Sequence, residues 1–176
     1  VTPDGNTVFV AGSINGGGGV YRITGLSGKE FKYPFDPATI GIKTTKIFNS
    51  TGQAATGIAL NDNDPNHLIV TLGAYGYTSH VFETKNALST GTPTFANITG
   101  DLPAFPVYDA FINPIKPNQY LIATEMGVWA TQDGGATWVE ENSGMDRVPT
   151  FMLRSMNYGD KPWIGPVVFA GTHGRG

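Results

Sequence analysis

The feature that most limits the fold of this chain is a sequence repeat with a period of about 50 residues. Residues 59–71 (ALNDNDPNHLIVT) align with residues 111–123 (FINPIKPNQYLIA), and identical Asn, Pro and Asn residues occur at one constant offset. The match continues as HVFETKN (80–86) over GVWATQD (127–133). A fixed period of this length indicates that one supersecondary unit is used repeatedly along the chain.

Partial copies of the same unit lie toward both ends of the sequence. Residues 105–113 (FPVYDAFIN) resemble residues 148–157 (VPTFMLRSMN), and residues 167–176 (VVFAGTHGRG) resemble residues 7–17 (TVFVAGSINGG). We therefore count four copies, of which the first and the last are incomplete.

Each copy is predicted to form short strands rather than helices. In the third copy, the segments VYDAFIN, YLIATE, GVWATQ and TWVEEN carry β-branched and aromatic residues at period two between Gly, Pro, Asn and Asp. Four strands per repeat predict an all-β fold of β-propeller blades, each a four-stranded antiparallel meander. The predicted blades span residues 1–50 (partial), 54–103, 104–149 and 150–176 (partial).

A closed propeller takes roughly four to eight blades, which is more than these copies provide. We expect residues 1–176 to be a partial propeller, the C-terminal part of a larger one of about seven blades. The remaining blades, from the same protein or from another chain, are its first expected partner, because an incomplete propeller leaves sheet faces and edges uncovered.

Composition excludes several classes of function. The net charge of -3 and scattered Arg residues argue against nucleic acid as a partner. No apolar run reaches the length of a membrane span, and the absence of Cys excludes disulfides and thiolate metal sites. Low Lys with abundant Thr, Asn and Gly favours a bacterial protein that is secreted or displayed on the cell surface.

Metal and cofactor sites are not predicted. Asp62 and Asp64 in the turn NDNDPN offer oxygen ligands for calcium, but the matching turn NPIKPN carries Lys116 and no carboxylate. His67, His80 and His173 fall in different copies without the spacing of metal ligands. No motif in the sequence indicates a cofactor.

The stretch TQDGGATW (131–138) is predicted to form the hairpin between the third and fourth strands of its copy. The glycines permit positive φ, the Asp133 carboxylate can accept hydrogen bonds from the backbone amides of the turn, and Trp138 can bury a large apolar area. The following five residues match every fixed position of the S/T-x-D-x-G-x-T-W pattern: Thr131, Asp133, Gly135, Thr137 and Trp138.

This pattern resembles the Asp-box, or BNR, repeat of propellers such as sialidases, sortilin-like receptors, xyloglucan-degrading glycoside hydrolases and bacterial surface proteins. The resemblance implies that the box is structural and lies away from the active site. The second copy keeps only Thr84, Asn86, Thr94 and Phe95 of the box, and AGTHGRG (170–176) resembles the closing blade of such bacterial propellers.

Turns alternate between the two ends of a meander, so one face is expected to hold the Asp-box and the Pro-Asn turns. The opposite face is expected to hold the loops 13–19, 74–79, 100–105, 125–127, 143–148 and 172–175. Variable loops on a rigid scaffold commonly carry recognition. The candidate ligand-binding residues on this face are Tyr75, Tyr77, His80, Phe105 and Arg147.

Two functions remain open on the sequence. A non-catalytic extracellular or cell-surface binding module, for adhesion or for a glycan or protein ligand, needs only blades and variable loops. The alternative is a fragment of a secreted glycoside hydrolase, xyloglucanase-like or sialidase-like, which needs paired carboxylates or an arginine cluster. The carboxylates expected on the candidate face are Glu125, Asp101 and Asp146, and Glu125, in a short loop after an apolar strand, is the best single catalytic candidate.

Overall fold

The computed structural model describes residues 1–14, 17–30, 36–37, 40–156 and 165–174 and arranges them in four antiparallel sheets. The first sheet has the order β1 (Thr7–Ile14), β2 (Gly17–Thr24) and β3 (Lys43–Asn49). The second consists of β4 (Ala55–Asn61), β5 (Asp64–Leu72), β6 (Val81–Thr84) and β7 (Ala96–Asn97). The third consists of β8 (Val107–Ile112), β9 (Tyr120–Thr124), β10 (Gly127–Thr131) and β11 (Val139–Glu140). The fourth pairs β12 (Thr150–Met156) with β13 (Val167–Thr172).

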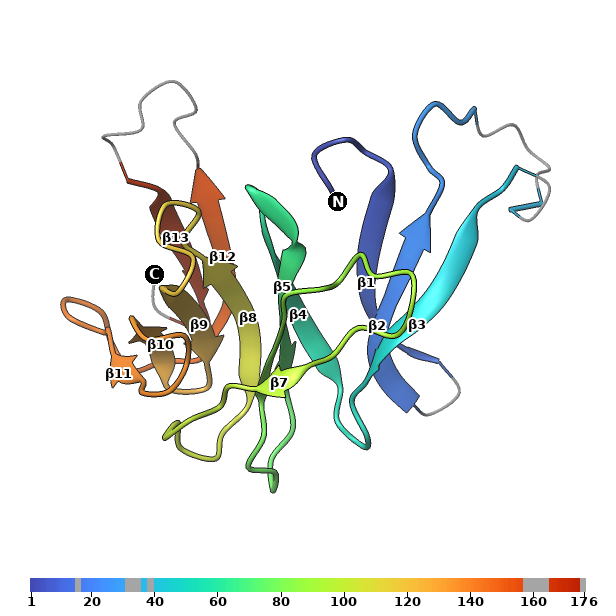
Figure 1. The fold of residues 1–176 in the computed structure, drawn as a ribbon. Coiled ribbons are helices and arrows are strands. Elements are labelled where there is room, and N and C mark those ends of the chain that lie inside the picture. The colour runs from blue at the N-terminus through green and yellow to red at the C-terminus, as the bar shows by residue number, and fades with distance from the viewer. Residues whose placement is uncertain (15–16, 31–35, 38–39, 157–164, 175–176) are drawn as a thin grey trace.

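Every strand pairs with the strand next to it in sequence, and every pairing is antiparallel. The four sheets lie side by side in chain order (Figure 1). The predicted all-β fold of consecutive four-stranded meanders is confirmed. Within the described residues, no helix has the length and apolar character that a bilayer crossing requires.

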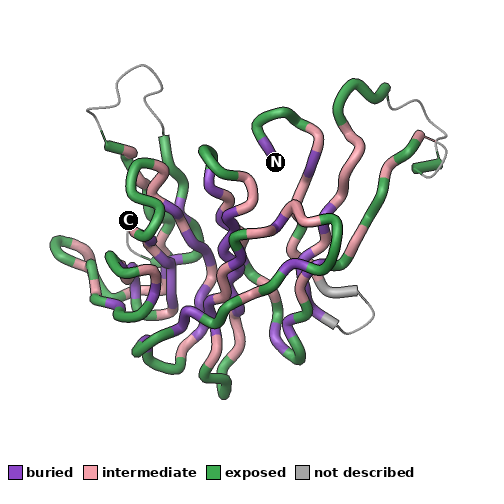
Figure 2. The backbone as a smooth tube through the Cα atoms, in the orientation of Figure 1, coloured by how far each residue is buried: buried purple, intermediate pink, exposed green. Residues whose placement is uncertain are grey.

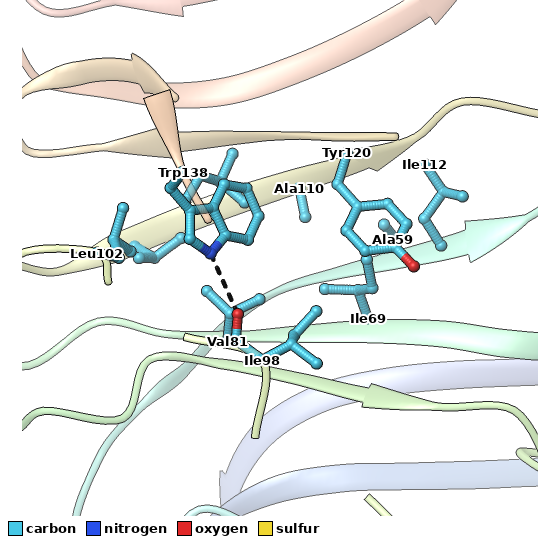
Figure 3. Packing of buried hydrophobic residues seen from close by; sticks show 11 residues of the cluster. Ala59, Ile69, Val81, Ile98, Leu102, Ala110, Ile112, Tyr120 and Trp138 are labelled. Atoms are coloured by element: carbon cyan, nitrogen blue, oxygen red, sulfur yellow. Dashed lines mark hydrogen bonds between the residues drawn. The ribbon is translucent and has the colours of Figure 1, made fainter. Parts of the chain in front are cut away.

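The core forms between neighbouring sheets rather than inside one of them. β5 is buried on both faces from His67 to Leu72, because sheets pack against both sides of it. Buried backbone therefore concentrates in the central strands, whereas the connecting loops are exposed (Figure 2). Between the second and third sheets, Trp138 and Tyr120 pack with aliphatic residues such as Ile69 and Ile98 (Figure 3).

The first strands of successive sheets approach closely, and this contact sets the position of the loops at their ends. The Thr56 hydroxyl donates a hydrogen bond of 2.6 Å to the Val107 carbonyl. A Cβ placed on Gly57 would lie 2.9 Å from Asp109 Cα and 2.9 Å from the Tyr108 carbonyl oxygen. Only glycine allows β4 and β8 to come this near each other.

A buried carboxylate ties β8 to β12. Asp109 lies next to the irregularity in the pairing of β8 with β9, and it is 8% exposed. Its Oδ2 atom accepts hydrogen bonds from the Leu153 amide at 2.9 Å and from Arg154 Nη1 at 2.8 Å. The charge is thus compensated by a cation and a backbone donor, as burial of a carboxylate requires. The fourth sheet is held against the third at the end where β8 and β12 begin.

Candidate functional site

The TQDGGATW turn is organised by one carboxylate. Asp133 Oδ1 accepts hydrogen bonds from the amides of Ala136 and Thr137, both at 3.0 Å, and from the Thr131 hydroxyl at 2.7 Å. Its Oδ2 atom accepts a bond of 2.7 Å from the Thr137 hydroxyl. The hydrogen bonds from Thr137 and Thr131 hold the pKa of Asp133 well below its usual range. A carboxylate with these four donors is fully used within its own turn.

The same turn packs against the preceding sheet. Trp138 is 4% exposed, and its indole Nε1 donates a hydrogen bond of 3.1 Å to the Ile98 carbonyl (Figure 3). The Trp138 amide donates to Asp101 Oδ1 at 2.8 Å. Gly135 has φ +88°, and a Cβ there would lie 2.6 Å from the Ile98 carbonyl oxygen.

These contacts correct one expectation about the faces. The loop 100–105 was expected at the end opposite the TQDGGATW turn, yet the Trp138 amide donates to Asp101, and a Cβ on Gly100 would clash with the Gly135 carbonyl oxygen. The reason is that β7 is only two residues long. The chain leaves the outer edge of the second sheet directly beside the turn of the third.

An acidic and aromatic cluster lies at the end of the sheets where β8 and β12 begin. The Tyr108 hydroxyl, on β8, donates a short hydrogen bond to the carboxylate of Glu125, in the β9–β10 turn. The Phe151 ring contacts the Tyr108 ring edge to face, with centroids 4.9 Å apart, and His173 contacts Phe151 with centroids 5.8 Å apart. We call Tyr75, Tyr108, Glu125, Phe151 and His173 the Glu125 cluster.

Tyr75 joins the cluster from the β5–β6 connection. Desolvation raises the pKa of its hydroxyl, and the charge of the Glu125 carboxylate and a hydrogen bond to it add to the shift. Desolvation followed by the hydrogen bond to Glu125 raises the pKa of Tyr108 in the same way. Both phenols stay protonated at neutral pH, and Tyr108 donates its O–H to the carboxylate.

The cluster is open to solvent. Tyr75 is 66% exposed and Phe151 is 48% exposed, whereas large apolar side chains are usually covered. Met126, next to Glu125, is exposed as well, at 42%. The result is a carboxylate surrounded by accessible aromatic faces, contributed by the second, third and fourth sheets.

The other candidate ligand-binding residues do not gather at this cluster. The Tyr77 hydroxyl donates a hydrogen bond of 3.4 Å to the Gly52 carbonyl, and Phe105 packs against Trp129 with ring centroids 5.6 Å apart. Arg147 forms an ion pair of 2.5 Å with Glu140. These three residues each have a local partner in the structure.

His80 was expected on the surface of the ligand-binding face, but it is buried. It is 0% exposed, and its ring nitrogens lie 3.2 Å from the Leu72 carbonyl oxygen and 2.8 Å from that of Tyr77. The physical reason is that the β5–β6 connection folds back over the ring, so that His80 closes the loop from inside.

Three members of the Glu125 cluster were not among the candidate ligand-binding residues: Tyr108, Phe151 and His173. A signal for two of them is present in the sequence. The overlay of FPVYDAFIN on VPTFMLRSMN puts Tyr108 and Phe151 at the same position of consecutive copies. An aromatic residue repeated at the start of a first strand marks neighbouring rings at one end of the blades. His173 lies in the loop 172–175, which the alternation of turns places on this face.

The chemistry of the cluster is that of recognition with one acid. Glu125 is the carboxylate at its centre, and the nearby Asp109 carboxylate is occupied by Leu153 and Arg154. Hydrolysis of a glycosidic bond by the common mechanism uses two carboxyl groups. Among the described residues, no group of three or more His, Asp or Glu side chains is placed to hold a metal ion.

Comparison with known proteins supports the fold. No protein-family model matches the chain, and no curated protein matches it either. Its structure is similar to a GH74 xyloglucanase from Xanthomonas campestris, with a TM-score of 0.55, 10% sequence identity and 87% of this chain covered. It is also similar to an ancestral GH74 enzyme, with a TM-score of 0.55, 15% identity and the same coverage.

The chain spans 24% of the length of the first of these structures and 19% of the second. At this level of identity the likeness concerns the fold. Together with the four consecutive antiparallel sheets, it identifies the structure as blades of a β-propeller.

Proposed function

We propose that these residues are part of an extracellular or cell-surface Asp-box propeller of bacterial type, and that they serve as a non-catalytic binding module for a glycan. The observation that carries the proposal is the Glu125 cluster, in which exposed aromatic rings stand around one hydrogen-bonded carboxylate. Sugars are bound through flat aromatic faces and through polar groups that accept from hydroxyls.

The part of the proposal that concerns an Asp-box propeller is supported by the Asp133 turn and by the order of the sheets. The Asp133 turn has the internal hydrogen bonds that a structural Asp-box needs, and we propose blade boundaries near 54–103 and 104–149 with partial blades on either side. The rest of a propeller of about seven blades is then the main partner of this segment. Secretion is supported by composition and by the kind of enzyme that the neighbouring structures represent.

A binding titration of the complete protein with xyloglucan oligosaccharides tests the proposal. We expect Phe151→Ala and Tyr75→Ala each to weaken binding about tenfold, since loss of a stacking ring costs on the order of 1–2 kcal/mol. Ile115→Ala is the matched control, because Ile115 is 55% exposed and lies in the turn at the other end of β8. Equal affinity of all three variants and the parent contradicts the proposal.

The second candidate function is a fragment of a secreted glycoside hydrolase. It is favoured by Glu125 itself and by the similarity to two GH74 enzymes. In that case the second carboxylate comes from residues outside the Glu125 cluster. Turnover of xyloglucan by the complete protein that is abolished in Glu125→Gln, with binding retained, decides for the enzyme and against the non-catalytic module.

A further inference from the structure

A groove of about 590 Å³ lies between the first and second sheets, at the opposite end of the strands from the Glu125 cluster. Its lining includes residues at the start of three strands, namely Thr7 of β1, Lys43 of β3 and Pro65 of β5. It also includes Thr24 at the end of β2. The segment 85–95 of the second sheet runs across toward the first sheet and contributes Leu88 (Figure 1).

Arg22 is the buried charge of this groove. The residue is 7% exposed, and its Nη1 atom donates to the carbonyl oxygens of Ala87 at 2.7 Å and Ser89 at 2.6 Å. Across the part of the chain that the structure describes, no carboxylate forms an ion pair with it. A guanidinium has five N–H donors, so Nε and Nη2 keep donors beyond those two bonds. When a buried cation donates only to backbone carbonyl groups, its charge is not neutralised, so binding of an anion beside it is favourable.

The balance of charge in the groove is positive. Lys43 lines it as a second cation, and Asp4 is the acid among the described lining residues. Asp4 Oδ1 accepts hydrogen bonds from the Thr2 hydroxyl at 2.6 Å and the Asn6 amide at 3.0 Å, and these bonds lower the pKa of Asp4. One oxygen of Asp4 is thus used within its own turn, and the two cations, Arg22 and Lys43, outnumber this one acid among the described lining residues.

At the interface between the second and third sheets, by contrast, a partly buried charge is compensated by neighbouring side chains of the protein. Glu83 lies at that interface. Its Oε1 atom accepts a hydrogen bond of 2.6 Å from the Tyr120 hydroxyl and lies 2.8 Å from His67 Nε2. Although burial acts to raise it, the bonds with His67 and Tyr120 lower the pKa of Glu83. This interface compensates its charge internally, whereas the Arg22 groove does not.

The remaining lining indicates the kind of anion. Thr7, Thr24, Thr45 and Thr90 line the groove together with the cations, and Pro65 and Leu88 add apolar surface. Hydroxyls and apolar patches suit the ring of a sugar, and a guanidinium suits a carboxylate. We propose that this groove binds an acidic sugar of the uronic acid class, with Arg22 and Lys43 holding its carboxylate. The proposal does not depend on the function of the Glu125 cluster.

Calorimetric titration of the complete protein with sodium glucuronate tests it, with glucose as the neutral probe of matched shape. We expect glucuronate to bind at least about tenfold more tightly than glucose, because hydrogen bonds between a cation and a carboxylate are stronger than those to a neutral hydroxyl. Lys43→Gln and Arg22→Gln should each weaken glucuronate binding severalfold. Lys85→Gln, which removes a cation from the neighbouring groove, should leave binding unchanged.

Arg22→Gln also removes the two hydrogen bonds to the carbonyls of Ala87 and Ser89, so Arg22→Lys, which keeps the positive charge, is measured beside it. Lys43→Gln changes only an exposed side chain and therefore tests the charge without disturbing the packing. No binding of glucuronate, equal binding of glucose, or glucuronate binding that is unchanged in Lys43→Gln overturns the proposal. Competition by acetate as strong as that by glucuronate overturns the sugar part of it.

Discussion

At the scale of single residues, the structure distinguishes an acid that stabilises its own turn from a half-buried acid that lies among aromatic rings. Both carboxylate oxygens of Asp133 accept from donors within residues 131–137, whereas Glu125 accepts from the Tyr108 hydroxyl beside exposed rings. The surroundings of these two carboxylates, rather than their residue type, distinguish a structural role from a binding one.

Asp133 predicts a pH dependence of stability. Its pKa in the folded state lies below the unfolded value of 3.8, so its stabilisation is fully present above that pH and is lost as the pH falls through the folded pKa. We expect Asp133→Asn to melt at a lower temperature than the parent at pH 7, and the difference to shrink below about pH 3. Glu141→Gln, at an exposed acid, is the control. A difference in melting temperature between Asp133→Asn and the parent that is the same at pH 7 and below about pH 3 contradicts the stabilising role of the Asp133 carboxylate.

Trp138 predicts a large loss of stability. Truncation of this buried ring to Ala should lower the free energy of unfolding by about 3–5 kcal/mol, through lost apolar contact and the cavity left behind. Chemical denaturation measures the change, and Val139→Ala, at a neighbouring position that is 53% exposed, should cost far less. Similar midpoints for Trp138→Ala and Val139→Ala would mean that the indole does not hold the second and third sheets together.

At the scale of elements, the contacts between sheets position the loops. The Thr56 hydroxyl and Gly57 bring β4 against β8, and Asp109 brings β8 against β12. Tyr108 and Phe151 stand next to each other because their strands are fixed in this way. The Glu125 cluster is therefore a product of packing between sheets and not of any one loop.

Gly57→Ala tests this contact. The added Cβ would meet Asp109 Cα and the Tyr108 carbonyl, both at 2.9 Å, so β4 and β8 must separate. We expect a cost of about 1–3 kcal/mol in denaturation. Gly12→Ala in β1 is the control, because a Cβ there has no heavy atom within 4 Å. If both variants unfold at the denaturant concentration of the parent, the approach of the two strands is looser than described.

The sequence predicted the strands and turns well, because they follow local rules that each copy repeats. The meander around YLIATE and GVWATQ forms as β9 and β10, and the Asp133 turn lies between β10 and β11. The burial of His80 and the contact of Gly100 with Gly135 were not predicted. Both depend on how a loop folds over its own sheet or meets the next sheet, and a repeat pattern contains no information on that path.

At the scale of the whole molecule, the four sheets present two ends with different side chains. One end carries Glu125 among exposed aromatic rings, and the other carries the buried Arg22 beside Lys43. Ligands of different charge are thus expected at the two ends: a neutral glycan against the rings, and an acidic sugar in the groove between the first two sheets.

The most direct test of the central claim is a crystal structure of the complete protein with a bound xyloglucan oligosaccharide. The claim predicts a sugar ring stacked on Phe151 or Tyr75, with a hydroxyl donating to the Glu125 carboxylate. An oligosaccharide bound elsewhere on the protein, with the Glu125 cluster free of sugar, would contradict it.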